Sequence, residues 1–116
     1  MQKRNNILRV AVQKSDDGPT AVGFLLVARN ACNAHIAKLV VAEHARGVGV
    51  GKSLLDSLLA SLKESRCLSC TLHVEEARLV AQKLYASRGF KVAGKRLDDY
   101  YAKGRHAWKM ELDMML

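Results

Sequence analysis

The sequence predicts an α+β fold in which one mostly antiparallel sheet has helices packed on its faces. The first observation is a series of apolar segments with period-two alternation between residues 7 and 42, which is typical of a strand meander. The second is that apolar residues recur at helical spacing in two later segments, each followed by another strand-like segment. A length of 116 residues suits one domain, 1–116, with a core of its own.

The predicted elements are delimited by turn residues and by changes of period. In chain order we expect strands over 7–13, 20–28 and 34–42, a helix over about 49–64, a strand over 68–74, a helix over 77–87, the start of a strand over 90–93, a polar, tyrosine-bearing loop over 97–104 and a closing strand over 105–112.

The same spacing assigns side chains to faces. Gly89 is expected at the C′ position that ends the second helix. The side chains expected to point toward the core are Leu54, Leu55, Leu58, Leu59 and Leu62 of the first helix, and Val80, Ala81 and Leu84 of the second. In the closing strand, one face is predicted to hold His106, Trp108, Met110 and Leu112, and the other Arg105, Ala107, Lys109 and Glu111.

The composition is that of a soluble globular protein and argues against several kinds of partner. No apolar run approaches the roughly 20 residues of a membrane span, and residues 1–6 are polar, with no apolar segment of a secretory signal after them. The formal charge is +8, but no run of five or more basic residues occurs and aromatic residues make up only 5%, so base stacking is not indicated. We expect neither nucleic acid nor membrane as a partner. A polyanionic small ligand would account for part of the basic excess.

The three cysteines are Cys32, Cys67 and Cys70. The last two form a lone C-x-x-C, which lacks the second pair of ligands that zinc requires. It leads into a predicted strand and not into a helix start, where a redox pair would sit. We therefore expect buried or half-buried thiols and no metal site. An odd number of cysteines without a signal favours a reducing compartment, so a cytoplasmic location is expected.

The most informative stretch is residues 45–53, which connect a predicted strand to a helix. Free N–H groups of the first helical turn, the helix dipole and glycines without a Cβ together suit a phosphate. The Walker A pattern G-x-x-x-x-G-K-[ST] fails because Arg46 stands five positions before Gly51. The dinucleotide pattern G-x-G-x-x-G fails because its last glycine would fall on Lys52 or Leu54. The pattern [QR]-x-x-G-x-G fits at Arg46, Gly49 and Gly51; the alternative is a glycine-rich turn that binds no ligand.

This loop and the residues after it resemble the GNAT superfamily of acetyl-CoA-dependent N-acetyltransferases. The subgroup that they resemble is the N-terminal protein acetyltransferases of the ribosomal-protein alanine acetyltransferase kind. The motifs are Arg46-x-x-Gly49-x-Gly51 and Leu84-Tyr85-x-x-x-Gly89-Phe90, and the resemblance runs from about Ile7 to the end of the chain. It implies a GNAT-like mixed sheet that is N-terminally shortened, because the family's opening strand and two helices have no counterpart before Ile7.

The resemblance implies a site for acetyl-CoA. Arg78 stands where the family has an asparagine that contacts the pantetheine arm; the alternatives are that Arg78 reaches a CoA phosphate instead and that the contact is lost. The family strand whose backbone pairs with the pantetheine matches Leu39, Val40 and Val41, and the pyrophosphate loop matches Arg46, Gly47, Val48, Gly49, Val50, Gly51 and Lys52.

The resemblance also implies catalytic and acceptor-binding residues. His73 stands where relatives have a glutamate or histidine general base, and Tyr85 matches the tyrosine that protonates the departing thiolate. Tyr100 and Tyr101 match a pair that lines the acceptor site. A histidine, with an ordinary pKa of about 6.5, suits removal of a proton from an ammonium group. From the residues alone, each of these four side chains could instead be structural. The other three histidines, His35, His44 and His106, are assigned no role.

We therefore expect an enzyme that transfers acetyl from acetyl-CoA to a primary amine, with a protein N-terminal α-amine as the favoured acceptor. The alternatives are a lysine side chain or small amine as acceptor, and a non-catalytic CoA-binding or interaction module. A sheet without the family's opening helices would leave apolar surface uncovered, and Arg9 and polar flanks alone would guard the edge strand over 7–13. A homodimer that covers this surface is the expected remedy.

Overall fold

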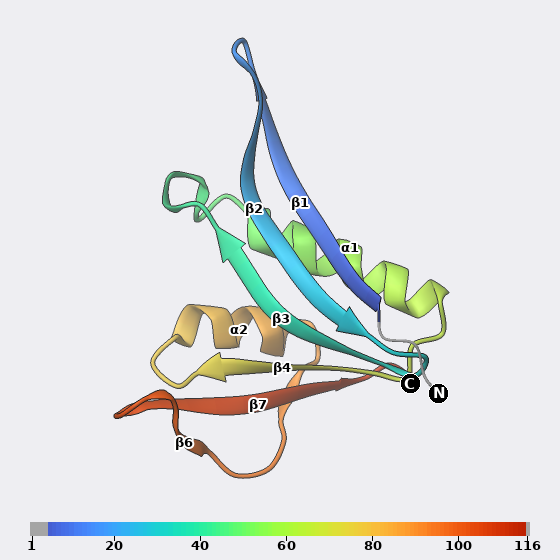
Figure 1. The fold of residues 1–116 in the computed structure, drawn as a ribbon, viewed down its shortest axis with the longest axis vertical. Coiled ribbons are helices and arrows are strands. Elements are labelled where there is room, and N and C mark those ends of the chain that lie inside the picture. Colours follow the sequence, from blue (N-terminus) through green and yellow to red (C-terminus); the bar gives the residue numbers. More distant parts are fainter. Residues whose placement is uncertain (1–4, 116) are drawn as a thin grey trace.

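The computed structural model describes residues 5–115 and shows one curved sheet with two helices on one of its faces (Figure 1). The elements in chain order are β1 (Asn5–Ser15), β2 (Gly18–Arg29), β3 (Asn33–Val41), the short 3-10 helix η1 (Glu43–Ala45), α1 (Val50–Glu64), β4 (Ser69–Glu75), α2 (Leu79–Ser87), β5 (Lys91–Val92), β6 (Leu97–Ala102) and β7 (Arg105–Asp113).

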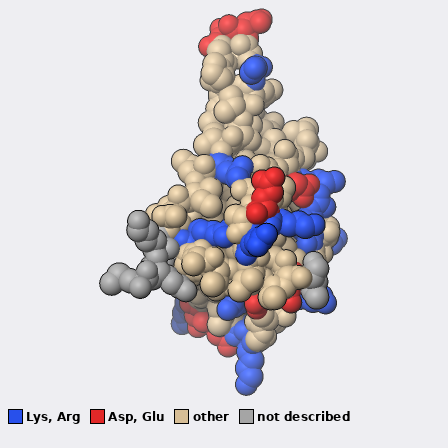
Figure 2. Space-filling view, turned by 90° about the vertical axis from the view of Figure 1, so that its right-hand side faces the viewer, with Lys and Arg blue, Asp and Glu red and all other residues tan. Residues whose placement is uncertain are grey.

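The sheet is mixed and mostly antiparallel, which confirms the predicted class. Its strand order is β1-β2-β3-β4-β7-β5, and β6 pairs with β7 beside this path. Among the described strands only β3 and β4 run parallel, and α1 provides the crossover between them. The β1–β2 hairpin is long and projects beyond the body of the molecule (Figure 1). Figure 2 shows acidic side chains at the tip of this hairpin and most of the Lys and Arg side chains of this view gathered over the body.

The core lies between one face of the sheet and the two helices. Leu55 and Leu58 of α1 are fully buried, as are Leu25 of β2 and Cys70 of β4. Tyr85 of α2 belongs to the same cluster. Both helices therefore cover the same side of the sheet, as Figure 1 also shows.

The opposite side of the sheet, called here the open face, is covered by neither helix. On β1 it presents Leu8, Val10 and Val12, whose exposed fractions are 62%, 47% and 52%. Leu8 and Val10 pair in register with Leu26 and Phe24 of β2, so the apolar part of the open face extends across two strands. Further along the sheet this face becomes polar, because the residues of β4 that alternate with its buried ones carry polar side chains.

A bulge in β3 shapes the middle of the sheet. Val27 of β2 pairs with Ile36, whereas Leu26 pairs with Lys38, so Ala37 is an extra residue without a partner on β2. The parallel pairing of β3 with β4 ends at Ile36. A bulged strand bends at the extra residue. As a result, β3 and β4 diverge toward their C-terminal ends, and α2 lies behind the opening (Figure 1).

Gly89 ends α2 as predicted. Its φ is +92°, in the left-handed region that favours glycine. Its N–H donates to the carbonyl of Ala86, and the N–H of Phe90 donates to the carbonyl of Tyr85. This pair of hydrogen bonds is the Schellman arrangement, which satisfies carbonyls at the helix end.

Two predictions about local structure are wrong. The segment predicted as a loop over 97–104 contains β6, because its backbone pairs with β7 at both ends of an irregular ladder. Val80 does not point inward but is 85% exposed; α2 begins at Leu79, two residues later than predicted, and turns Tyr85 into the core instead. Ala107 lies on the predicted face, because it pairs with Glu75 of β4 just as Lys109 pairs with His73, and its small side chain is fully buried there.

We expect Gly89→Ala to destabilise the fold more than Gly94→Ala. Both glycines have positive φ, so an added Cβ costs each about 1–2 kcal/mol in backbone conformation. At Gly89 that Cβ would also lie 3.1 Å from Leu112 Cδ1, whereas nothing lies within 4 Å at Gly94. Urea unfolding of both variants measures the difference. Equal losses would show that Leu112 moves aside without cost.

Candidate active site

The loop between β3 and α1 has the form of an anion site. Gly47 and Gly49 have φ of +80° and +90°, and α1 begins directly afterwards at Val50. The first N–H groups of a helix have no partner within the helix, and they carry the positive end of its dipole. An added Cβ at Gly47 or Gly49 would meet nothing within 4 Å, so the loop is open to a ligand. Its backbone and the nearby Lys52 fit a pyrophosphate.

The loop is held at the end of β3. Arg46 donates from Nε to the carbonyl of Val41 over 3.1 Å. The first turn of α1 packs between β3 and α2, because an added Cβ at Gly51 would lie 3.6 Å from Val41 and 3.7 Å from Leu84. The candidate pyrophosphate loop, the end of β3 and α2 therefore meet at one place, the mouth of the opening between β3 and β4.

The segment Leu39–Val41 lies along this opening. Its residues pair in register with Leu25, Phe24 and Gly23 of β2 on one side. On the other side, pairing with β4 has already ended at Ile36, and no described strand takes its place. The backbone groups on that edge of β3 are thus available to an extended ligand.

His73 lies on β4 and points to the open face. Its ring stacks on that of Tyr100 with centroids 4.8 Å apart, and the Tyr100 hydroxyl lies 3.4 Å from its Nδ1. Burial and the charge of Lys109, its register partner on β7, lower the pKa of His73 from its ordinary value. The imidazole is therefore neutral at neutral pH, which is the form that accepts a proton.

Tyr85 lies on the core side of the sheet. It is 7% exposed, and its ring meets Phe90 edge-on at 5.8 Å between centroids. Burial raises the pKa of Tyr85, and the charge of Arg78 offsets part of that rise. The phenol therefore keeps its proton at neutral pH and is able to donate it. Tyr85 and His73 lie on opposite faces of β4 and make no direct hydrogen bond.

Arg78 occupies the N-cap of α2. Its side chain makes no hydrogen bond or ion pair among the described residues, and its charge acts on Glu75, Tyr85 and Tyr101. Arg78 is thus a positive charge at the N-terminal end of α2, and it acts on Tyr85.

Tyr100 and Tyr101 lie on β6 with ring centroids 5.0 Å apart. Tyr100 contacts His73, so the structure brings one predicted acceptor residue against the predicted base. Tyr101 lies under the guanidinium of Arg105, which is 5.6 Å from the ring centroid. Burial raises the pKa of Tyr101. Both tyrosines are about half exposed, so they remain available to a ligand.

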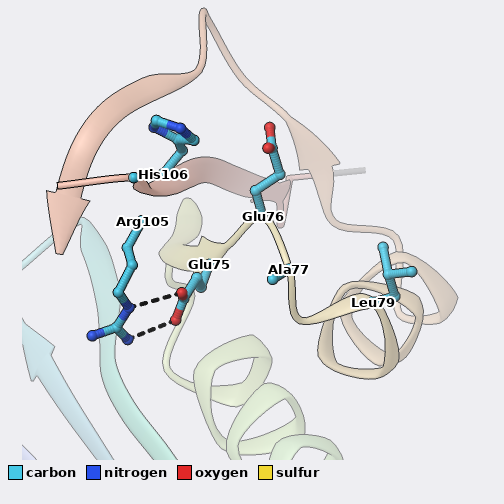
Figure 3. Close-up of a pocket in the computed structure, with 7 residues that line it drawn as sticks. Glu75, Glu76, Ala77, Leu79, Arg105 and His106 are labelled. Atoms are coloured by element: carbon cyan, nitrogen blue, oxygen red, sulfur yellow. Dashed lines mark hydrogen bonds and ion pairs between the residues drawn. The ribbon is translucent and has the colours of Figure 1, made fainter. Parts of the chain in front are cut away.

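Ion pairs fasten the hairpin that carries these tyrosines to the end of β4. Arg105 donates two hydrogen bonds to the Glu75 carboxylate, at 2.8 and 2.9 Å (Figure 3). Arg96 reaches Glu76 at 3.2 Å. The hydrogen bond from Arg105 lowers the pKa of Glu75. The hairpin is therefore fixed to the same strand that carries His73.

A cavity of about 240 Å³ lies at this attachment (Figure 3). His73, Tyr85 and the loop that contains Gly47 and Gly49 do not line this cavity. It is bounded by Glu75, Glu76, Ala77, Leu79, Gly104, Arg105 and His106.

His106 and His35, to which the sequence assigns no role, each contact other residues of the site. His106 accepts the N–H of Asp99 at Nδ1 over 3.0 Å, which holds Asp99 at its positive φ of 54°. His35 lies beside His73, with ring centroids 5.1 Å apart. No local sequence pattern predicts this contact, because it depends on the register between β3 and β4, which are separated by 27 residues of the chain.

Two of the three cysteines belong to the hydrophobic core. Cys67 and Cys70 are buried and Cys32 is partly buried, and all three are free. Burial raises the pKa of Cys70 to about 12. Within residues 5–115, no group of three metal-ligating side chains comes together. Neither described helix is long and apolar enough to cross a membrane.

Known proteins resemble this chain in both sequence and structure. The chain is 34% identical over 84 residues to the N-alpha-acetyltransferase MAK3 of Arabidopsis thaliana, a match that covers 72% of this chain and 44% of that protein. Its fold matches Ard1 from Thermoplasma volcanium with a TM-score of 0.77 and 28% identity, over 84% of this chain and 66% of that one. It also matches the ribosomal-protein-S18-alanine N-acetyltransferase of Escherichia coli with a TM-score of 0.85 and 21% identity, over 96% and 70% of the two chains. The chain thus spans less than half the length of the MAK3 protein.

The family model of the acetyltransferase (GNAT) family matches residues 4–90, which include the glycine loop, His73 and Tyr85. The chain belongs to the GNAT acetyltransferase family.

Proposed function

We propose that this protein transfers an acetyl group from acetyl-CoA to a primary amine. The observation that carries the proposal is the meeting, at the mouth of the β3–β4 opening, of a glycine loop at a helix N-terminus with an unpaired strand edge. The loop suits a pyrophosphate, and the edge suits an extended, amide-bearing arm. The neutral His73 follows the last residue of β4 that pairs with β3, and the protonated Tyr85 lies in the core cluster on the other side of the sheet.

Different residues would bind different parts of the cofactor. Backbone N–H groups from Gly47 to Lys52 would hold the pyrophosphate, with Arg46 and Lys52 adding positive charge. The free edge of Leu39–Val41 would pair with the pantetheine arm, and Arg78 would reach a phosphate or the arm from α2. Bound acetyl-CoA supplies an activated acetyl thioester whose thiolate is the leaving group.

His73 would accept a proton in the reaction, and Tyr85 would donate one. An amine reaches the site as an ammonium and must lose a proton before its lone pair is able to attack. The neutral imidazole of His73 takes that proton. A backbone N–H on the free edge of β3 would stabilise negative charge on the thioester oxygen. The Tyr85 phenol would supply the proton for the thiolate leaving group.

A protein N-terminal α-amine is the acceptor that we favour. The MAK3 protein is an N-alpha-acetyltransferase by name, and Tyr100 and Tyr101 offer half-exposed aromatic surface beside His73. Mass spectrometry of a peptide library incubated with the protein and acetyl-CoA tests this choice. If only lysine side chains or small amines were acetylated, they would be the acceptors in place of the N-terminal α-amine. If the protein bound CoA but acetylated no amine, it would be a non-catalytic CoA-binding module.

We expect CoA to bind the loop and to raise the melting temperature, because a ligand that binds only the folded state stabilises it. Gly49→Asp should abolish this rise, since it places a Cβ and a negative charge beside the pyrophosphate. Gly94→Asp is the matched control, because Gly94 also has positive φ and open surroundings but lies outside the loop. Stabilisation by ATP and not by CoA would contradict the proposed cofactor.

His73→Ala should lower kcat by roughly 10²-fold or more, which is the usual contribution of a general base. Tyr85→Phe keeps the ring and removes the proton, so it should also lower kcat. Neither change should alter CoA affinity much, and isothermal titration with CoA measures this. In the parent protein, activity should fall as the pH decreases through the lowered pKa of His73, that is, below the ordinary histidine range. Unchanged turnover in both variants would make the two residues structural.

We further propose that two copies pair through the apolar part of the open face. Leu8, Val10 and Val12 are about half exposed there on the edge strand β1. Arg9 does not guard that edge, because it turns to the other side of the sheet and donates to Ser57 of α1. Light scattering at micromolar concentration should give twice the mass of 12.8 kDa, and Val10→Lys should halve it. A monomeric parent protein would refute the dimer.

A further inference from the structure

His106 lies on β7 opposite the segment that carries Tyr100 and Tyr101, and it has no part in the mechanism described so far. We propose that His106 is a positioning residue, whose Nδ1 holds the segment 98–101 and thereby sets the two tyrosines for the acceptor. This inference rests on the proposed acetyl transfer and concerns the binding of the peptide that receives the acetyl group.

The pairing of β6 with β7 contains a large bulge. Leu97 pairs with Ala107 and Ala102 pairs with Arg105, so the whole segment 98–101 lies opposite the single residue His106. A bulge leaves backbone groups without partners in the ladder, and these groups then need partners of another kind. Both tyrosines lie within this segment, so their positions depend on the contacts that hold the bulge.

The side chain of His106 supplies one of these partners. The N–H of Asp99 donates to Nδ1 of His106 over 3.0 Å. Because an N–H is only a donor, Nδ1 accepts with its lone pair, and the proton of the ring lies on Nε2. The carboxylates of Asp98 and Asp99 lie 3.8 and 3.9 Å from the same nitrogen, which is too far for a hydrogen bond. The contact between His106 and the bulge is therefore made through the backbone of Asp99.

Asp99 is held at both its backbone and its side chain. Its φ is +54°, in the left-handed region that is uncommon for residues other than glycine. Its carboxylate accepts the N–H of Gly104 over 2.7 Å, at the turn between β6 and β7. His106 and Gly104 together fix the conformation of Asp99, and the direction in which the next residue, Tyr100, leaves the backbone follows from it.

The tyrosine rings lie on the side of β7 away from the His106 ring. Tyr100 stacks on His73 with centroids 4.8 Å apart, and the Arg105 guanidinium lies 5.6 Å from the ring centroid of Tyr101. His106 and Arg105 are adjacent in a strand and point to its opposite sides (Figure 3). His106 therefore acts on the tyrosines through the backbone of the bulge and not by contact with their rings.

The backbone of His106 is anchored independently of its side chain. Its carbonyl accepts the N–H of Glu76 over 2.9 Å, and the neighbouring Arg105 donates two hydrogen bonds to Glu75. The imidazole itself lies outside the buried core, with 24% of the side chain exposed. Removal of the ring should thus release the segment 98–101 and leave the attachment of β7 to β4 in place.

The hydrogen bond is measured by NMR without any substrate. His106→Ala removes the acceptor, whereas His106→Asn keeps an acceptor oxygen near the place of Nδ1, because both atoms are bonded to Cγ. In His106→Ala the amide hydrogen of Asp99 should exchange faster with solvent, and the NOEs between the rings of Tyr100 and His73 should weaken. His106→Asn should retain both signals.

Asp113→Ala is the matched control. Asp113 lies on the same strand as His106, and its side chain also accepts a backbone N–H, that of Met115 at 2.9 Å. It pairs with Ser69 at the other end of β4. The control variant should leave the exchange of the Asp99 amide and the ring NOEs unchanged.

The functional effect is measured in acetyl transfer to a peptide amine. His106→Ala should raise the KM for the peptide by about two- to tenfold, the equivalent of one hydrogen bond. The KM for acetyl-CoA and kcat at saturating peptide should change little, because His73, Tyr85 and the glycine loop are untouched. His106→Asn should restore most of the peptide KM. A loss of stability alone would reduce the amount of active protein and leave this KM unchanged.

A double-mutant cycle measures whether His106 acts through Tyr100. In the Tyr100→Ala background, His106→Ala should raise the peptide KM by a smaller factor than in the parent protein, because one of the rings that it positions is gone. Equal factors in the two backgrounds would show that His106 acts by another route and would overturn the proposal.

The outcomes separate this inference from the proposed function. An unchanged peptide KM in His106→Ala, or an Asp99 amide whose exchange does not respond, would refute the positioning role even if acetyl transfer were normal. If no amine is acetylated but the NOEs between Tyr100 and His73 depend on His106 as expected, the acetyl-transfer function fails and the positioning of the tyrosines by His106 stands.

Discussion

The bulge at Ala37 is the constraint on which the rest of the structure depends. It ends the pairing of β3 with β4 after four residue pairs and bends β3 away. If the ladder continued to Val41, the edge of Leu39–Val41 would bond to β4 and be lost to a ligand. The glycine loop would then follow a closed sheet. One unpaired residue therefore turns an ordinary parallel pair into the opening around which the candidate site is arranged.

The two faces of the sheet carry different groups: one packs in the core, and the other carries most of the candidate site residues. The helices and the buried leucines lie on one side, whereas His35, Thr71, His73 and Tyr100 lie on the other. Tyr85, the proposed acid, belongs to the core cluster on the side of the helices. The carbonyl of Tyr85 accepts a hydrogen bond from the N–H of Phe90 at the end of α2. Tyr85 therefore takes part both in the packing of the core and in the backbone hydrogen bonds that terminate the helix.

The sequence was sufficient for features that depend on neighbouring residues. The leucine face of α1, the helix end at Gly89 and the strand–loop–helix around Arg46 follow from local spacing, and the structure contains them. Features that depend on register could not be predicted in this way. Val80 is 85% exposed although it lies four residues before Leu84, and β6 forms by pairing with β7 that no local pattern indicates. The contact of His35 with His73 belongs to the same class, since it arises from the pairing of distant strands.

The projecting β1–β2 hairpin has a consequence for hydrodynamics. The molecule measures 47 × 36 × 26 Å, and its radius of gyration is 15.0 Å, whereas a compact chain of this length would have about 13 Å. An elongated particle diffuses more slowly than a sphere of equal mass and elutes earlier from a sizing column. It also tumbles anisotropically, so NMR relaxation rates will depend on the orientation of each N–H bond relative to the hairpin axis. Elution volume alone therefore overstates the mass of this protein.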